Sequence, residues 1–162
     1  SLPEPVHENR DFLPDETSVI VAYYKGQEHF DWILNNHLYN VRAGESKGSI
    51  VLNNELINAR YLLLHNGKES HHLIRINKEG PKIYTRAELI KMGYPQYRIS
   101  GTDEIDTERE KREANKIYLV FKLFKNNSAE KELLVYKWDK LGDTRPHTEN
   151  LVKLISRAKK IH

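Results

Sequence analysis

The stretch 60–77 constrains the fold of this 162-residue chain more than any other segment. Residues 61–65 form a compact apolar run, and Asn66-Gly67 follows as a strong turn signal because both residues tolerate positive φ. Residues 72–76 then alternate between two faces, with Leu73 opposed to Ile74 and Arg75 opposed to Ile76. The pattern predicts a β-hairpin with one wall in the core, and other strands can add to its edges.

Length and composition are those of one globular domain with a sizeable core. Hydrophobic residues make up 38% of the chain and charged residues 30%. No apolar run approaches the roughly 18–20 residues of a transmembrane helix, and no signal-peptide pattern opens the chain. The absence of cysteine excludes disulfides and thiolate chemistry. We therefore expect a cytoplasmic protein without a membrane partner.

The formal net charge of +3 hides an uneven distribution. Residues 1–17 carry a net charge of −4 and are expected to form an acidic N-terminal arm. Residues 99–115 carry −3 and are expected to be a charged insertion in a single domain, residues 18–162. Subtracting both segments leaves +10 on the rest of the chain. Such a body attracts polyanions, although a solvated lysine-rich surface would have the same charge.

The segments before the hairpin alternate between strand and helix signals. Residues 27–36 have the apolar spacing of an amphipathic helix, and Asn53 or Asn54 can cap a helical turn. The elements expected here are a strand at 18–24, a helix at 27–36, a strand at 38–42, a polar loop at 43–48, a strand at 49–52 and a turn of helix at 54–59.

After the hairpin, Thr85 and Glu88 have capping-box spacing, and Gly93 stands where a helix would end. The segment 99–115 fits a long loop, a solvated helix or a disordered stretch. The expected elements are strands at 82–84, 116–124 and 131–138 and helices at 86–92 and 148–161, with an aromatic loop at 94–98.

Most links between these strands are too short for parallel crossovers. The predicted fold is therefore α+β, with a mainly antiparallel curved sheet or a small open barrel flanked by two or three helices.

Trp32 is the first candidate for a binding residue. The predicted helix directs Phe30, Ile33 and Leu34 inward and leaves Trp32 to one side. An indole outside the core face can serve as a stacking platform for a base. The alternative is that the helix is buried more widely and Trp32 belongs to the core.

The strand at 38–42 and the loop after it form a second candidate group. Asn40 and Arg42 share one face of the strand, while Tyr39 lies on the other. Arginine and asparagine side chains read base edges, and Ser46, Lys47 and the loop amides could hold phosphates. The alternative is a solvent-facing strand and an ordinary loop.

A third group interleaves basic and aromatic residues, as nucleic-acid surfaces do, although loops also collect tyrosines for packing. Its members are Lys82, Tyr84, Arg86, Lys91, Tyr94, Tyr97 and Arg98.

Catalytic signatures are weak, so no catalytic residue, metal ligand or cofactor is assigned. His71 and His72 are expected to point to opposite faces of a strand, which prevents joint chelation. Residues 147–162 only faintly resemble the end of an HNH nuclease, and Glu130-Lys131-Glu132 lacks the spacing of a PD-(D/E)xK nuclease. Neither a G-x-S-x-G elbow nor a phosphate-binding G-x-x-x-x-G-K loop occurs.

The run from the aromatic helix through residues 39–42 (YNVR) to the hairpin resembles PUA-like modules of the EVE and YTH type. It is also similar to B3-like domains, which serve as the DNA-reading parts of restriction systems. The resemblance covers residues 18–77 and departs at residues 21–24, where VAYY replaces a tryptophan-rich strand. A PUA-like domain would take a flipped base into an aromatic pocket, whereas a B3-like domain would insert strands and loops into the major groove.

These observations predict a DNA-binding specificity module from a restriction or DNA-processing protein, without catalysis of its own. Its partners would be double-stranded DNA, with a modified or flipped base as one form of target, and other domains or subunits of a restriction complex. The alternatives are a divergent metal-dependent nuclease and a protein-interaction domain.

Overall fold

The computed structural model describes residues 16–42, 53–143 and 145–161. Within these ranges, five α-helices, one 3-10 helix and ten strands form an α+β fold with three sheets, which do not close into a barrel. The α+β prediction is confirmed. The expected strand at 49–52 and almost all of the expected acidic arm lie outside the described residues.

The main sheet has the strand order β5-β3-β1-β9. It contains β1 (Ser18–Tyr23), β3 (Tyr61–His65), β5 (His72–Arg75) and β9 (His147–Asn150). The central strands β1 and β3 run parallel, and the outer strands pair antiparallel with them. Every residue of β3 is buried, in agreement with its apolar run at 61–64.

The predicted hairpin is confirmed, because β3 pairs antiparallel with β5 from Tyr61 opposite Arg75 to Leu64 opposite His72. Gly67 adopts a φ of +93° in the connection, a conformation that favours glycine. The connection also contains β4 (Glu69–Ser70), which pairs with β8 (Tyr136–Asp139) of a second small sheet. The hairpin thereby joins two of the three sheets.

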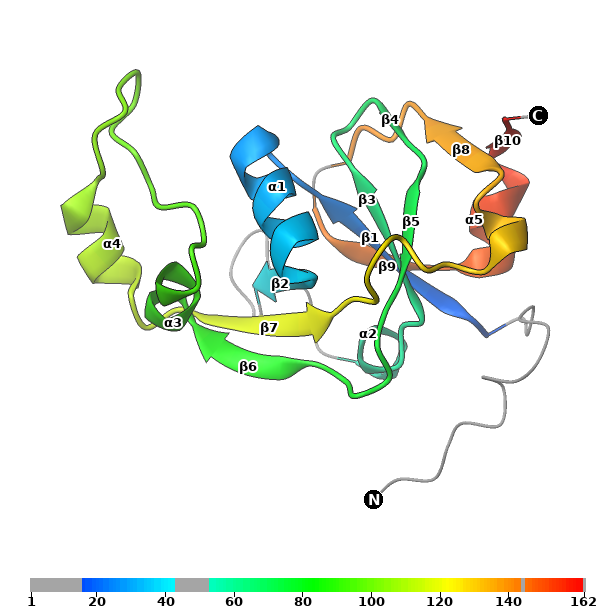
Figure 1. Cartoon of the computed structure of the whole chain (residues 1–162), viewed down its shortest axis with the longest axis horizontal. Helices are drawn as coiled ribbons and strands as arrows, with labels where there is room; N and C mark the ends of the chain where they lie inside the picture. The colour runs from blue at the N-terminus through cyan, green and yellow to red at the C-terminus, as the bar shows by residue number, and fades with distance from the viewer. Residues whose placement is uncertain (1–15, 43–52, 144, 162) are drawn as a thin grey trace.

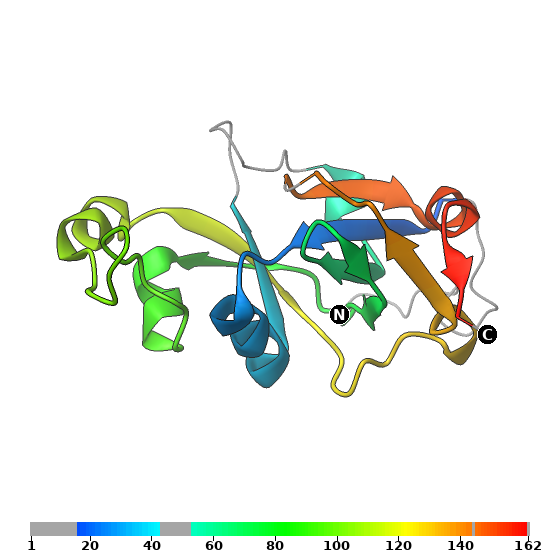
Figure 2. The same cartoon turned by 90° about the horizontal axis from the view of Figure 1, so that it is seen from above.

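The third sheet forms an arm that leaves the main body (Figure 1). It consists of β2 (Leu38–Arg42), β7 (Ile117–Lys122) and β6 (Lys82–Thr85), with β7 in the middle. At its far end lie α3 (Arg86–Lys91) and α4 (Thr107–Glu113), which together form a lobe apart from the main sheet (Figure 2). The capping box of α3 is present as predicted.

The C-terminal segments differ from the predictions. The first half of the expected strand 131–138 is a 3-10 helix, Lys131–Leu133, and only its second half is a strand. The expected helix 148–161 is divided into β9, α5 (Leu151–Ser156) and β10 (Lys159–Lys160). The Asn150 side chain accepts a hydrogen bond from the Lys153 amide, so the helix begins only after residue 150. The residues before it pair with the edge of β1.

The first helix, α1 (Gln27–Asn36), has the predicted bounds but a different buried face. Trp32 is 5% exposed and Ile33 is fully buried, whereas Leu34 is 36% exposed. The Trp32 indole N–H donates to the Met92 carbonyl at 3.0 Å. The second helix, α2 (Asn54–Ile57), is capped by Asn53 as expected. None of the helices described is long and apolar enough to cross a membrane.

Candidate functional site

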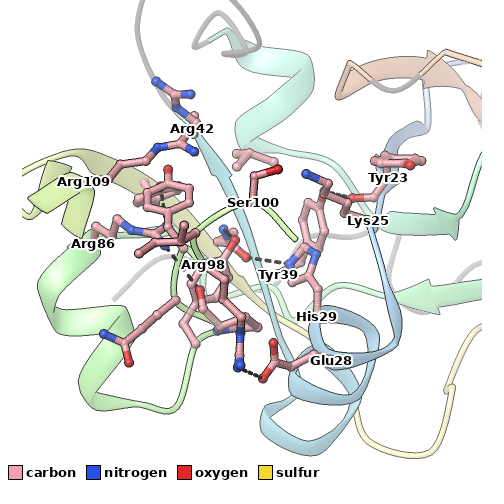
Figure 3. Close-up of a pocket in the computed structure, with 18 of the residues that line it drawn as sticks. Tyr23, Lys25, Glu28, His29, Tyr39, Arg42, Arg86, Arg98, Ser100 and Arg109 are labelled. Carbon is pink, nitrogen blue, oxygen red and sulfur yellow. Dashed lines mark hydrogen bonds and ion pairs between the residues drawn. The ribbon is translucent and has the colours of Figure 1, made fainter. Parts of the chain in front are cut away.

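A cleft of about 580 Å³ lies between α1, β2 and the lobe that carries α3 and α4 (Figure 3). Seven residues predicted for the binding site line it: Tyr39, Asn40, Arg42, Arg86, Tyr94, Tyr97 and Arg98. They come from two sequence groups that are about forty residues or more apart, and the third sheet, β2-β7-β6, brings them together.

Four other predicted site residues, Trp32, Lys82, Tyr84 and Lys91, are not part of the cleft lining. Lys82 and Tyr84 lie on β6, and Lys91 lies on α3. Trp32 is packed behind the cleft, where its ring meets the Tyr94 ring edge to face at 5.0 Å. The structure therefore places Trp32 in the core, which was the alternative to a stacking role. Ser46 and Lys47 fall outside the described residues.

Cationic side chains surround the mouth of the cleft. Figure 3 shows Arg42 and Arg109 toward one edge and the Glu28–Arg98 pair toward the other. The Arg98 guanidinium lies 3.2 Å from the Glu28 carboxylate, and both side chains are exposed. Because exposed ion pairs contribute little stability, an anionic ligand could replace Glu28 as the partner of Arg98.

Arg86 lines the cleft but is engaged with the protein. It is 2% exposed, and its Nε and Nη2 donate to the two carboxylate oxygens of Glu110 at 2.8 and 3.0 Å. Its Nη1 donates to the Tyr118 hydroxyl at 3.2 Å. Burial alone would lower the pKa of Arg86, but these bonds outweigh it and raise the pKa. Arg86 was predicted as a nucleic-acid-binding residue, and the structure shows its guanidinium buried and bonded within the protein.

Tyr97 is held between two guanidinium groups. Those of Arg86 and Arg109 each lie 3.7 Å from the centre of its ring. Its hydroxyl donates to Glu113 at 2.6 Å, and its backbone N–H donates to Glu110 at 2.6 Å. With cations over the ring, Tyr97 is poorly placed to stack on a base.

The segment 99–115 supplies the anions of this network. It contains the helix α4, which was one of three possibilities open from the sequence. The hydrogen bond from Tyr97, joined by those from Lys116 and Arg109, outweighs burial and lowers the pKa of Glu113 to about 2. The negative charge of this insertion therefore holds the aromatic loop 94–98 in place.

The floor of the cleft is polar and uncharged. Asn40 is 7% exposed, and its Nδ2 donates to the Tyr94 hydroxyl oxygen at 3.0 Å. Its Oδ1 lies 3.3 Å from Nε2 of His29. Burial lowers the pKa of His29, against the opposing effect of the hydrogen bond to Asn40. These side chains come from α1, β2 and the loop after α3.

Sequence reasoning missed His29, Lys25 and Arg109 as lining residues. His29 lies one turn before the buried Ile33, so a polar face of α1 adjoining the core was the available signal. Arg109 lies in the segment 99–115, whose conformation could not be chosen from the sequence. Its position depends on contacts with Tyr97 that no local pattern contains.

The histidine pair His71-His72 also differs from the prediction. Because β4 ends at Ser70 and β5 begins at His72, His71 lies between strands, and the two rings are only 4.3 Å apart. Within the described ranges, no group of three histidine or acidic side chains could hold a metal ion. No family model, curated protein or solved structure matches the chain.

Proposed function

We propose that this protein is a DNA-binding module whose ligand occupies the cleft between α1, β2 and the α3–α4 lobe. The observation that carries the proposal is the combination of an arginine-lined mouth, tyrosine side chains in the lining (Tyr39, Tyr94 and Tyr97) and an uncharged polar floor in one cleft of about 580 Å³. Nucleic acids present anionic phosphates beside neutral planar bases, and proteins bind the two parts with different side chains.

The mouth supplies the phosphate contacts. Lys25, Arg42, Arg98 and Arg109 are cations that line the cleft, whereas Arg86 is buried and bonded to Glu110. Arginine donates hydrogen bonds to phosphate in a fixed fork. The formal charge of +10 on the chain outside its two acidic segments supports attraction of a polyanion over longer distances.

The interior supplies space for a base. Its volume lies within the range of about 300–1,000 Å³ usual for small-molecule pockets. We favour entry of an unstacked or flipped base over insertion of strands into the major groove, because the polar groups lie on the floor of a concave site. Methylated bases are included among the targets. The proposal implies a cytoplasmic setting and a place within a larger restriction or DNA-processing assembly.

Fluorescence anisotropy of labelled duplex DNA tests the proposal, with methylated and unmethylated duplexes across a salt series. We expect log K to fall linearly with log salt concentration as phosphate contacts release counterions. Arg98→Ala should weaken binding. Arg157→Ala is a matched control, because Arg157 is also exposed and paired with a glutamate, Glu149, but follows α5 and does not line the cleft. Equal affinity of wild type and Arg98→Ala would remove the cleft from consideration.

The same experiment addresses the alternative functions. A nuclease would cleave the duplex when Mg²⁺ is added and would stop when the metal is chelated. A protein-interaction domain would bind DNA only non-specifically at low salt, and Arg98→Ala would then bind no more weakly than Arg157→Ala.

A further inference from the structure

The hydrogen bonds on the floor of the cleft fix the direction in which each polar group donates. The Asn40 carbonyl oxygen can only accept, so the proton in its contact with His29 belongs to Nε2 of the imidazole. Burial lowers the pKa of His29 below the ordinary 6.5, which favours the uncharged ring at neutral pH. A neutral imidazole carries one proton, so His29 Nδ1 keeps a lone pair and is a hydrogen-bond acceptor.

The direction of hydrogen bonding at Tyr94 follows in the same way. Its hydroxyl oxygen accepts a hydrogen bond from Asn40 Nδ2, and its own proton remains available to donate. In the part of the chain that the structure describes, no group bonds to His29 Nδ1 and none accepts the Tyr94 hydroxyl proton. Both residues line the cleft, and their ring centres lie 5.4 Å apart. Figure 3 shows His29 reaching from α1 toward the cleft.

The floor thus presents one acceptor and one donor on neighbouring rings, without net charge. We propose that His29 and Tyr94 together read the edge of a neutral nucleobase, with His29 Nδ1 accepting from a base N–H and the Tyr94 hydroxyl donating to a base nitrogen or carbonyl oxygen. Nucleobase edges place such donors and acceptors next to each other. This inference rests on the proposed function and assigns the residues that recognise the base.

A phosphate group does not fit this floor. Its oxygens are acceptors at neutral pH, and one of them would face the lone pair of His29 Nδ1. The arginines at the mouth have the complementary chemistry for phosphate, so the two parts of a nucleotide are recognised at different depths of the cleft.

Lowering the pH should reverse the preference of the floor for a neutral base over an anion. When pH falls through the lowered pKa of His29, Nδ1 gains a proton and the floor becomes a cationic pair of donors. A nucleobase then loses its acceptor, whereas an anion gains a partner. The charged and titratable groups around His29 are those that line the cleft: Tyr23, Lys25, Glu28, Tyr39, Arg42, Arg86, Tyr94, Tyr97, Arg98, Arg109 and Tyr118.

Long-range ¹H–¹⁵N NMR of the histidine side chains tests the proposal on the full chain. The separate probes are the four deoxynucleosides, which lack phosphate, and inorganic phosphate. At pH 7.5 we expect the His29 Nε2–H tautomer and a shift of Nδ1 on addition of at least one nucleoside but not of phosphate. The opposite tautomer, or a response to phosphate alone, would overturn the assignment.

Two variants extend the test. Tyr94→Phe removes the donor and should weaken nucleoside binding roughly fivefold to tenfold, the effect of one hydrogen bond. His29→Phe should do the same and also abolish the pH dependence. Tyr136→Phe is the control, since Tyr136 packs against the other core cluster. If duplex DNA binds but nucleosides do not, or if both variants bind nucleosides normally while folded, this inference fails and the proposed function stands. If duplex DNA does not bind either, both fail.

Discussion

The ion pair between Glu28 and Arg98 connects the N-terminal end of α1 to the loop after α3 across the mouth of the cleft. If phosphate competes with Glu28 for Arg98, Glu28→Gln should raise the affinity for duplex DNA. The gain should not exceed roughly fivefold, because an exposed pair contributes at most about 1 kcal/mol. Anisotropy titration measures the change. Glu132→Gln removes the same charge from an exposed residue of the 3-10 helix and serves as control.

A lower affinity of Glu28→Gln than of wild type would contradict this competition. It would indicate that Glu28 positions Arg98 for its ligand.

Substitutions of Trp32 distinguish a role in core packing from a role in DNA binding. Since its indole is buried and donates to the Met92 carbonyl, Trp32→Ala should lower the free energy of unfolding by about 3–5 kcal/mol. Urea unfolding measures this loss. Trp32→Phe should keep most of the packing and bind DNA like the wild type. A fully stable Trp32→Ala variant with weakened DNA binding would restore the stacking role.

The residues that the sequence identified were those whose type and local spacing suffice. Asn40 and Arg42 alternate with Tyr39 along one strand, and that strand borders the cleft. The face of α1 was assigned wrongly because its buried side is determined by partners distant in sequence. Trp32 meets Tyr94 and Met92, about sixty residues away, and no periodicity within ten residues encodes this contact.

The helix α4 gives the aromatic loop its conformation. Arg86 is buried, and Glu110 both pairs with it and accepts from the Tyr97 amide. Glu110→Ala should therefore destabilise the lobe by roughly 3 kcal/mol, the cost of leaving a buried charge without its partner. Glu108→Ala is the control on the same helix, because Glu108 is exposed.

Hydrogen exchange is the sharper readout of that substitution, since the Tyr97 amide loses its acceptor. Its protection should fall in Glu110→Ala and not in Glu108→Ala. Equal protection in both variants would mean that the loop is held without α4.

Elements with complete local signals were predicted correctly. The capping box of Thr85 and Glu88 marks the beginning of α3, and the apolar run of β3 fixes its burial. The strand β9 was missed, because its four half-buried residues lack an alternating pattern and form a strand only by pairing with β1. The conformation of 99–115 stayed open for the same reason, since its glutamates need Arg86 and Tyr97 as partners.

Acidification should destabilise the whole molecule, first through its histidines. Burial lowers the pKa of His29, His65 and His72 from the ordinary value of 6.5. Between the folded and unfolded pKa values the unfolded chain binds more protons, so stability falls as pH drops below 6.5. His65 should contribute strongly, because its Nδ1 accepts from the Gly67 amide and its Nε2 is buried without a partner among the described residues. Protonation would break the first bond and charge a buried ring.

A second loss of stability should follow at lower pH and has the same sign. Hydrogen bonds lower the pKa of Glu113 to about 2, against an ordinary value of 4.5, so its contribution is present above 4.5 and disappears as pH falls toward 2. Thermal melting at constant ionic strength should therefore show a falling Tm between pH 7.5 and 5.5 and a further fall below 4.5.

His65→Asn, which keeps an acceptor near the Gly67 amide and cannot become charged, should flatten only the first step. A Tm that is constant from pH 7.5 to 5.5 would show that the buried histidines protonate without cost, and an unchanged first step in His65→Asn would assign that step to His29 and His72.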